Sequence, residues 1–100
     1  VQTMPNIKDP NVDKLLEGIL TLQTLDEALE FFKDLCTVRE MQSMAQRYVV
    51  ARMLTDKRVY KDIVSETGAS TATISRVNRS LSDSSNGYAL VFSRVDGKKS

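Results

Sequence analysis

The sequence predicts an all-α fold of about six helices that contains a helix-turn-helix and is expected to form an intertwined or tightly packed homodimer. Apolar residues recur at the three- and four-residue spacing of amphipathic helices along most of the chain. A glycine and a Ser/Thr-rich segment separate two short helical patterns within residues 60–81. The apolar positions of the central helix cover more than one face, and a chain of 100 residues is too short to bury them alone. This favours a dimer; the alternative is a central helix in a monomeric bundle.

Residues 1–10 contain both prolines and no apolar period, so we expect a flexible N-terminal arm ahead of a single helical domain over residues 11–95. Two amphipathic helices follow the arm. The apolar positions of the first are Val12, Leu15, Leu16, Ile19 and Leu20, and those of the second are Leu25, Ala28, Leu29, Phe32 and Leu35. The Thr24 to Glu27 segment fits a capping box, in which hydroxyl and carboxylate satisfy each other's unpaired amides.

A second capping box, Thr37 to Glu40, opens the long central helix. Its apolar positions are Met41, Met44, Ala45, Tyr48, Val49, Ala51 and Leu54. After a polar loop at 55–58, a short helix is predicted over 60–67, and Gly68 ends it by adopting a left-handed backbone conformation. Ser70 is placed to cap a helix over 71–81. A polar break at 82–87 precedes a last helix near 88–95, and residues 96–100 are predicted to be disordered.

The helices over 60–81 meet the requirements of a DNA-reading helix-turn-helix. The second helix begins with small and hydroxyl side chains that can approach base edges, and basic residues flank it as phosphate contacts. The candidate DNA-binding residues are Lys57, Arg58, Lys61, Ser70, Thr71, Ala72, Thr73, Ser75, Arg76 and Arg79. No acid lies between Thr67 and Ser82. The alternative is a pair of ordinary antiparallel helices with a Ser/Thr-rich surface.

Composition argues against several other classes. The chain has no His and a single cysteine, Cys36, so neither an intrachain disulfide nor the usual nitrogen ligand for zinc is available. No nucleophile and base stand at a recognisable spacing, so we expect no enzyme and no cofactor. No apolar run reaches the length of a membrane span, and a cytoplasmic protein is expected.

Charge is unevenly distributed along the chain. Residues 1–56 carry 6 Lys or Arg against 9 Asp or Glu, whereas residues 57–100 carry 8 against 4. This asymmetry is typical of a dimerisation half joined to a half that meets a polyanion.

The recognition segment resembles that of the Trp repressor superfamily. The matching residues are Gly68, Ala69, Ala72, Thr73, Ile74, Ser75, Arg76, Ser80 and Leu81, with Thr37, Glu40 and Arg47 upstream. Over about residues 12–95 the chain is similar to the YerC/YecD-type branch of Trp-repressor-like proteins. The resemblance implies an intertwined homodimer that presents two recognition helices to double-stranded DNA, with half-sites roughly 34 Å apart. The function expected is a sequence-specific transcriptional regulator, a repressor; the alternative is a protein-interaction module that has lost DNA specificity.

The resemblance also implies candidate effector-binding residues. Arg47 and Arg76 match the two arginines between which Trp repressors hold the indole of tryptophan, and Thr37 and Ser80 match hydroxyls near that ligand. Val77 stands where Trp repressors have the glycine that leaves room for it. We therefore expect DNA binding that does not need tryptophan, with a different small effector as an open possibility. Alternatively, Arg47 pairs with a neighbouring acid and Arg76 contacts only phosphate.

Overall fold

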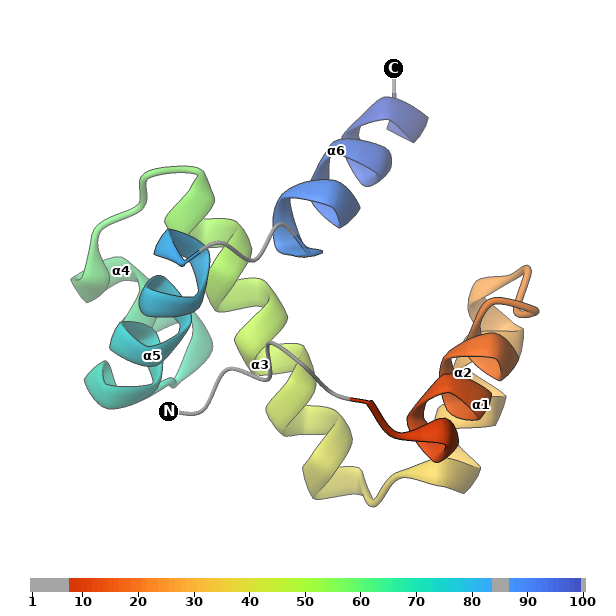
Figure 1. Ribbon diagram of the computed structural model, residues 1–100. Helices are drawn as coiled ribbons and strands as arrows, with labels where there is room; N and C mark the ends of the chain where they lie inside the picture. Colours follow the sequence, from red (N-terminus) through yellow and green to blue (C-terminus); the bar gives the residue numbers. More distant parts are fainter. Residues whose placement is uncertain (1–7, 84–86, 100) are drawn as a thin grey trace. The chain divides into compact units, whose positions relative to one another are not determined.

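The computed structural model describes residues 8–83 and 87–99, and within these ranges it contains six α-helices and no strand, which confirms the predicted all-α class (Figure 1). The helices are α1 (Pro10–Ile19), α2 (Leu25–Leu35), α3 (Val38–Thr55), α4 (Tyr60–Thr67), α5 (Thr71–Ser82) and α6 (Gly87–Lys99). The chain separates into two compact units, which divide between Gln42 and Ser43. The single domain expected over 11–95 stays a prediction. The division falls within α3 because the buried residues of this helix are confined to the segment from Val50 to Met53.

Helix α1 begins inside the range that was expected to be a flexible arm. Pro10 occupies its first turn, where its fixed φ suits a helix and its missing N–H is no loss. The side chain of Asp9 caps the helix by accepting a hydrogen bond from the Asn11 backbone N–H at 2.9 Å. The arm predicted for residues 1–10 is therefore already ordered at Asp9 and Pro10, and its residues 1–7 lie outside the described ranges.

Both predicted capping sequences are used, although in different ways. At the start of α3, the Thr37 hydroxyl accepts from the Glu40 N–H at 3.1 Å and the Glu40 carboxylate accepts from the Thr37 N–H at 2.8 Å. At the start of α2, the Thr24 hydroxyl accepts from the Glu27 N–H at 3.1 Å, but the Glu27 carboxylate reaches one residue further, to the N–H of Gln23 at 2.8 Å. Each arrangement satisfies two helix-terminal donors, which fixes where the helix begins.

The first unit leaves its apolar side chains largely uncovered. Neither α1 nor α2 contains a fully buried residue. Leu20 and Leu25 are 84% and 86% exposed, and Leu16 and Leu29 are half exposed. Both helices are strongly amphipathic, so these leucines form ordered apolar faces and not scattered surface positions. An apolar surface of this kind is typical of a region that is covered by a partner.

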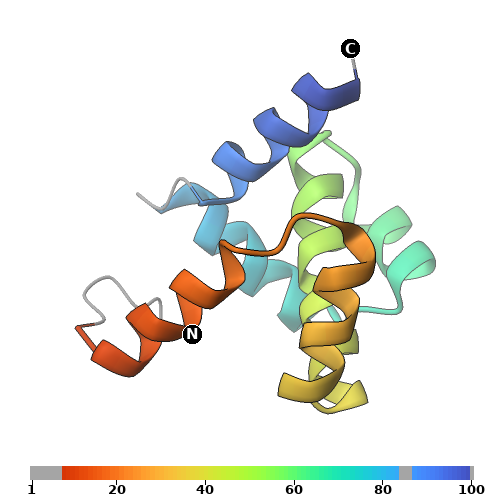
Figure 2. The ribbon, with the colours of Figure 1, turned by 90° about the vertical axis from the view of Figure 1, so that its right-hand side faces the viewer.

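The second unit carries the hydrophobic core. Its α4 and α5 lie beside the C-terminal half of α3, as Figures 1 and 2 show from two directions. The buried residues come from α3, α4, the turn before α5, α5 and α6: Val50, Ala51, Met53, Ile63, Ala69, Ile74, Val77 and Phe92. This cluster fixes the helix-turn-helix against α3, because side chains from all of its parts share one close-packed interior.

Phe92 anchors α6 to α3 within this core. The Phe92 ring lies edge-to-face with Tyr48 of α3 at a centroid distance of 5.2 Å and is stacked with Tyr88 at 5.8 Å. The guanidinium of Arg52 stands 5.2 Å from the centroid of the same ring. Cation–π and aromatic contacts of this geometry favour a defined packing of α6 beyond simple burial of apolar area.

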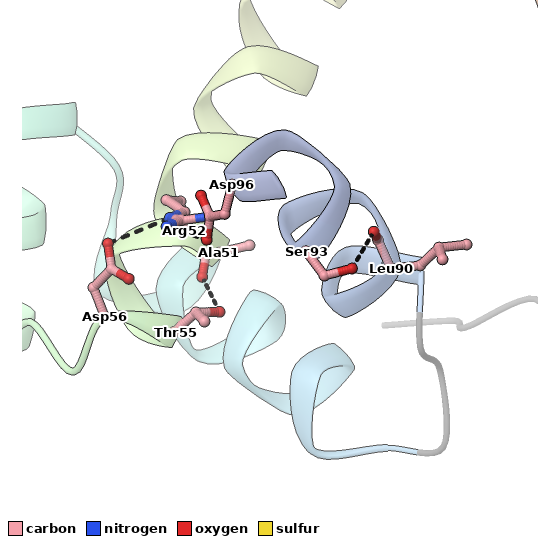
Figure 3. A network of polar contacts seen from close by, with 7 residues as sticks. All are labelled: Ala51, Arg52, Thr55, Asp56, Leu90, Ser93 and Asp96. Atoms are coloured by element: carbon pink, nitrogen blue, oxygen red, sulfur yellow. Dashed lines mark hydrogen bonds and ion pairs between the residues drawn. The ribbon is translucent and has the colours of Figure 1, made fainter. Parts of the chain in front are cut away.

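An ion pair continues the attachment of α6 toward its C-terminus. Arg52 Nη2 donates to the Asp96 carboxylate at 3.0 Å, and Arg52 Nε donates to Asp56 at 3.4 Å (Figure 3). The hydrogen bond to Asp96 raises the pKa of the Arg52 guanidinium above its ordinary value. The disorder predicted for residues 96–100 is thus wrong for 96–99, which continue α6; Ser100 lies outside the described residues. A sequence pattern could not reveal this pair, because its partners are 44 residues apart.

Lys57 takes a backbone conformation that normally belongs to glycine. Its φ is +67°, and it follows α3 in a Schellman arrangement. The Lys57 N–H donates to the Leu54 carbonyl and the Arg58 N–H to the Met53 carbonyl, each at 3.0 Å. A residue with a Cβ in this region costs roughly 1–2 kcal/mol relative to the right-handed conformation.

We therefore expect Lys57→Gly to raise the free energy of unfolding by up to about 1 kcal/mol, because glycine removes the left-handed strain. Thermal unfolding followed by circular dichroism measures the effect as a rise of several degrees in Tm. Lys61→Gly is the matched control: it lies within α4, so glycine there should lower stability by roughly 1 kcal/mol. A lower Tm for Lys57→Gly would contradict the strain argument.

Candidate nucleic-acid interface

The turn between α4 and α5 is shaped by Gly68, as the sequence predicts. Gly68 ends α4 with φ +71° and donates its N–H to the Val64 carbonyl at 2.9 Å. The Thr67 hydroxyl supports the same turn, since it donates to the Ile63 carbonyl at 2.6 Å and accepts from the Ala69 N–H at 3.1 Å. No atom lies within 4 Å of a Cβ built on Gly68, so the backbone conformation and not space demands glycine here.

A side chain from α3 holds the turn in place. Gln46 Nε2 donates to the Thr67 carbonyl at 3.1 Å, and Ala69 of the turn is 2% exposed in the core. Sequence reasoning missed Gln46, because the hydrogen bond joins positions 21 residues apart and no local pattern marks it. The orientation of α5 therefore depends on α3 as well as on the turn itself.

Ser70 and Thr73 use their hydroxyl groups to start α5. Ser70 Oγ accepts from the Thr73 N–H and donates to Thr73 Oγ1, both at 3.1 Å. Thr73 is half-buried, whereas Ser70 is exposed. Both residues are predicted base contacts, but in the free protein their hydroxyls are engaged with each other in the helix cap.

The outward face of α5 presents polar side chains that form no hydrogen bond or ion pair within the described residues. The predicted contact residues Thr71, Ala72, Ser75, Arg76 and Arg79 are all exposed. Among the described residues, no hydrogen bond or ion pair engages the hydroxyls of Thr71 and Ser75 or the guanidinium groups of Arg76 and Arg79. Ile74 and Val77 are buried on the opposite face. The α5 helix thus shows a packed inner side and an outer side of free donors and acceptors.

The predicted phosphate contacts before and within α4 fall into two groups. Lys57 and Lys61 are exposed, and neither side chain has an ion-pair partner within residues 8–83 and 87–99. Arg58 instead pairs with Glu66 and lies 4.0 Å from the Asp62 carboxylate. The charge of Arg58 is therefore offset locally by acids of α4, and the two lysines remain as the free cations at this end of the interface.

Of the candidate effector residues, Thr37 belongs to the first unit, and Arg47, Arg76 and Ser80 belong to the second. Arg47 and Arg76 are both exposed, and no described contact joins them. The Thr37 hydroxyl serves the cap of α3, and the Ser80 hydroxyl donates to the Arg76 carbonyl at 3.3 Å. The alternative pairing of Arg47 with a neighbouring acid is not found within the described part of the chain.

Val77 belongs to the core of the second unit. It is 3% exposed and lies in the cluster that also contains Ile74 and Phe92. Its side chain therefore contributes to the packing of α5 on the rest of the unit.

No helix of residues 8–83 and 87–99 is long and apolar enough to cross a membrane. No group of three or more His, Cys, Asp or Glu residues in the same ranges is placed to hold a metal ion. Cys36 is a free, partly buried thiol.

Comparison with known proteins places this architecture in a family. Residues 10–96 match the family described as Trp repressor protein. The uncharacterised protein YerC of Bacillus subtilis (strain 168) is 48% identical over 89 residues, which cover 89% of this chain and 86% of YerC. The crystal structure of a TrpR-like protein from Eubacterium eligens matches with a TM-score of 0.86 and 53% identity, over 89% of this chain and 92% of that one.

A second solved structure, of a candidate Trp repressor from Staphylococcus aureus, matches with a TM-score of 0.85 and 45% identity over 89% of each chain. The family match covers both compact units and the whole helix-turn-helix. The chain belongs to the Trp repressor family of DNA-binding regulators.

Proposed function

We propose that this protein is a sequence-specific transcriptional repressor that acts in the cytoplasm as a homodimer and reads the major groove with α5. The observation that carries the proposal is the outward face of α5, where Thr71, Ser75, Arg76 and Arg79 are exposed and unengaged. Small hydroxyl side chains can approach base edges, and guanidinium groups can bind phosphate or guanine. The buried Ile74 and Val77 hold this face in a fixed orientation.

The homodimer is supported by the first unit. Its leucines are ordered along amphipathic helices but are not buried, and a second copy of the chain would cover them with matching apolar surface. A two-fold dimer presents two copies of α5, and their separation would set half-sites roughly 34 Å apart on one face of the DNA. Net charge is only +1, so affinity has to come from specific contacts and dimer geometry more than from general attraction to DNA.

The DNA assignment predicts different effects for the face of α5 and for its basic flank. Ser75→Ala removes a base-edge donor and should relax sequence preference, whereas Lys61→Ala removes a phosphate contact and should weaken binding similarly on all sequences. Selection of bound sequences from random DNA, followed by titration of the selected and scrambled sites, measures both quantities. Arg58→Ala is the matched control for Lys61→Ala, and its effect should be smaller because Glu66 and Asp62 already offset its charge.

Equal losses on all sequences for Ser75→Ala and Lys61→Ala would contradict these roles. Absence of binding to any genomic fragment at low salt would instead favour a protein-interaction module derived from a helix-turn-helix.

The effector part of the proposal is that DNA binding does not require tryptophan. Val77 replaces the glycine that makes room for the ligand in Trp repressors, and here its side chain is packed into the core. We expect calorimetry to detect no micromolar tryptophan binding, and we expect added tryptophan to leave DNA affinity unchanged. Micromolar binding that disappears in both Arg47→Ala and Arg76→Ala would overturn this expectation. A different small effector at these arginines is compatible with the proposal.

A further inference from the structure

Asn78 is a polar residue of α5 whose amide has no role in holding the fold. It is exposed, and within the described residues its side chain makes no hydrogen bond; the Ser82 hydroxyl bonds the Asn78 backbone carbonyl, at 3.1 Å. The helix does not require asparagine at position 78. The helix propensity of asparagine is below that of Lys, Gln or Ala, so one of these residues would suit the helix better. A free amide is therefore available to a ligand on the surface of α5.

The helical register places Asn78 with two residues already assigned to the DNA-reading face. At 100° per residue, Thr71, Ser75 and Asn78 fall within about 60° of one another around the α5 axis. Their spacing of four and then three residues also occurs among the base-contacting residues of the homeodomain recognition helix. Asn78 lies about 10 Å beyond Thr71 along the axis, which corresponds to roughly three base-pair steps.

The chemistry of the side chain then selects a base. An amide carries a carbonyl acceptor and an NH₂ donor side by side, and the major-groove edge of adenine offers the complementary N6 donor and N7 acceptor. Serine and threonine hydroxyls are less selective, since one rotatable hydroxyl can serve several bases. An amide can also donate to a phosphate oxygen, but that contact carries no sequence preference.

We propose that Asn78 is a specificity-determining residue that reads one adenine in each half-site through two hydrogen bonds. The proposal rests on the proposed function, because it requires α5 to enter the major groove. It goes beyond it by naming the residue and the base that it selects. The base pair concerned is distinct from the one that Ser75 contacts, because the two side chains lie about 4.5 Å apart along the helix axis.

The test compares base preference among variants of the full chain. The wild type, Asn78→Ala, Asn78→Asp and the control Asn11→Ala are each used to select sites from random DNA, and their affinities are then titrated on probes that differ at one base pair. Asn11 is also exposed but lies on α1, so its replacement removes the same amide away from α5. Thermal unfolding is recorded for every variant.

We expect the wild type and Asn11→Ala to prefer adenine at one position of the half-site by about tenfold. Asn78→Ala should reduce this preference to within about twofold and leave the other positions and the Tm unchanged. Asn78→Asp should shift the same position toward cytosine, because a carboxylate can accept a hydrogen bond from cytosine N4 but cannot donate one to adenine N7.

Two results would overturn the proposal while the DNA-binding function stands: unchanged preference in Asn78→Ala, or an equal loss of affinity on every sequence, which would indicate a phosphate contact. If the wild type itself enriches no sequence, the proposed function fails, and the assignment of Asn78 fails with it.

Discussion

Replacement of Ile74 by alanine is expected to lower the free energy of unfolding by about 2–5 kcal/mol. Ile74 is completely buried, and it packs in α5 against a core that includes Ile63 and Val50, which are also 0% exposed. The loss combines the transfer free energy of the deleted carbons with the cavity that they leave. A core as small as this one has few other side chains able to close the gap, so the expected change is a large share of the 5–15 kcal/mol typical of a whole domain.

Urea denaturation followed by far-ultraviolet circular dichroism measures this loss as a lower midpoint at an unchanged slope. Protein concentration is held constant between variants, since the proposed dimer would make apparent stability depend on it. Val59→Ala is the control: Val59 is 60% exposed just before α4, and its replacement should change stability by less than about 0.5 kcal/mol. Similar small effects of the two substitutions would mean that α5 is not packed on α3 and α4 in solution.

The second large effect is expected for DNA affinity when Arg76 and Arg79 are both changed to alanine. Both guanidinium groups are exposed on α5 and free of acidic partners in the described chain. If each neutralises one phosphate, a dimer loses four such contacts, and affinity at moderate salt should fall by about 100-fold or more. The logarithmic salt dependence of binding should become shallower by about 3.6, or by about 1.8 if a single chain binds.

Titrations of a selected site across a range of salt concentrations supply both numbers. The control is the double variant Arg39→Ala and Arg94→Ala, which removes the same charge from exposed positions on α3 and α6. It should leave the salt slope near that of the wild type. An equal decrease in slope for both double variants would show that overall charge, and not the face of α5, determines binding.

Local patterns were sufficient for most of the secondary structure. The capping residues Thr24, Thr37 and Ser70 accept the expected helix-terminal N–H groups, and Gly68 has the predicted left-handed conformation. These features are governed by interactions within four residues, which is why a sequence reveals them. The predicted last helix ends too early. The ion pair between Arg52 and Asp96, which secures the C-terminal part of α6, forms only when α6 approaches α3.

The candidate interface is predicted only in part, for a different reason: side-chain rotamers decide which of its polar groups are already engaged. Helical periodicity placed Ser75, Arg76 and Arg79 correctly on an exposed face, and the same periodicity could have included Asn78. It could not show that Glu66 would form an ion pair with Arg58, nor that the hydroxyls of Ser70 and Thr73 would hydrogen-bond to each other. Which polar groups remain free for a ligand depends on rotamers and neighbours that a pattern does not contain.

The sequence by itself determined the helices, the turn at Gly68 and the family, because spacing, caps and glycine act locally. Tertiary structure decided how those parts are used. It buried Val77 with Phe92 in the core, joined Gln46 to the turn at Thr67, and left the leucines of α1 and α2 without cover in the single chain. These outcomes depend on contacts between residues distant in sequence, and their free energy arises only when the helices pack.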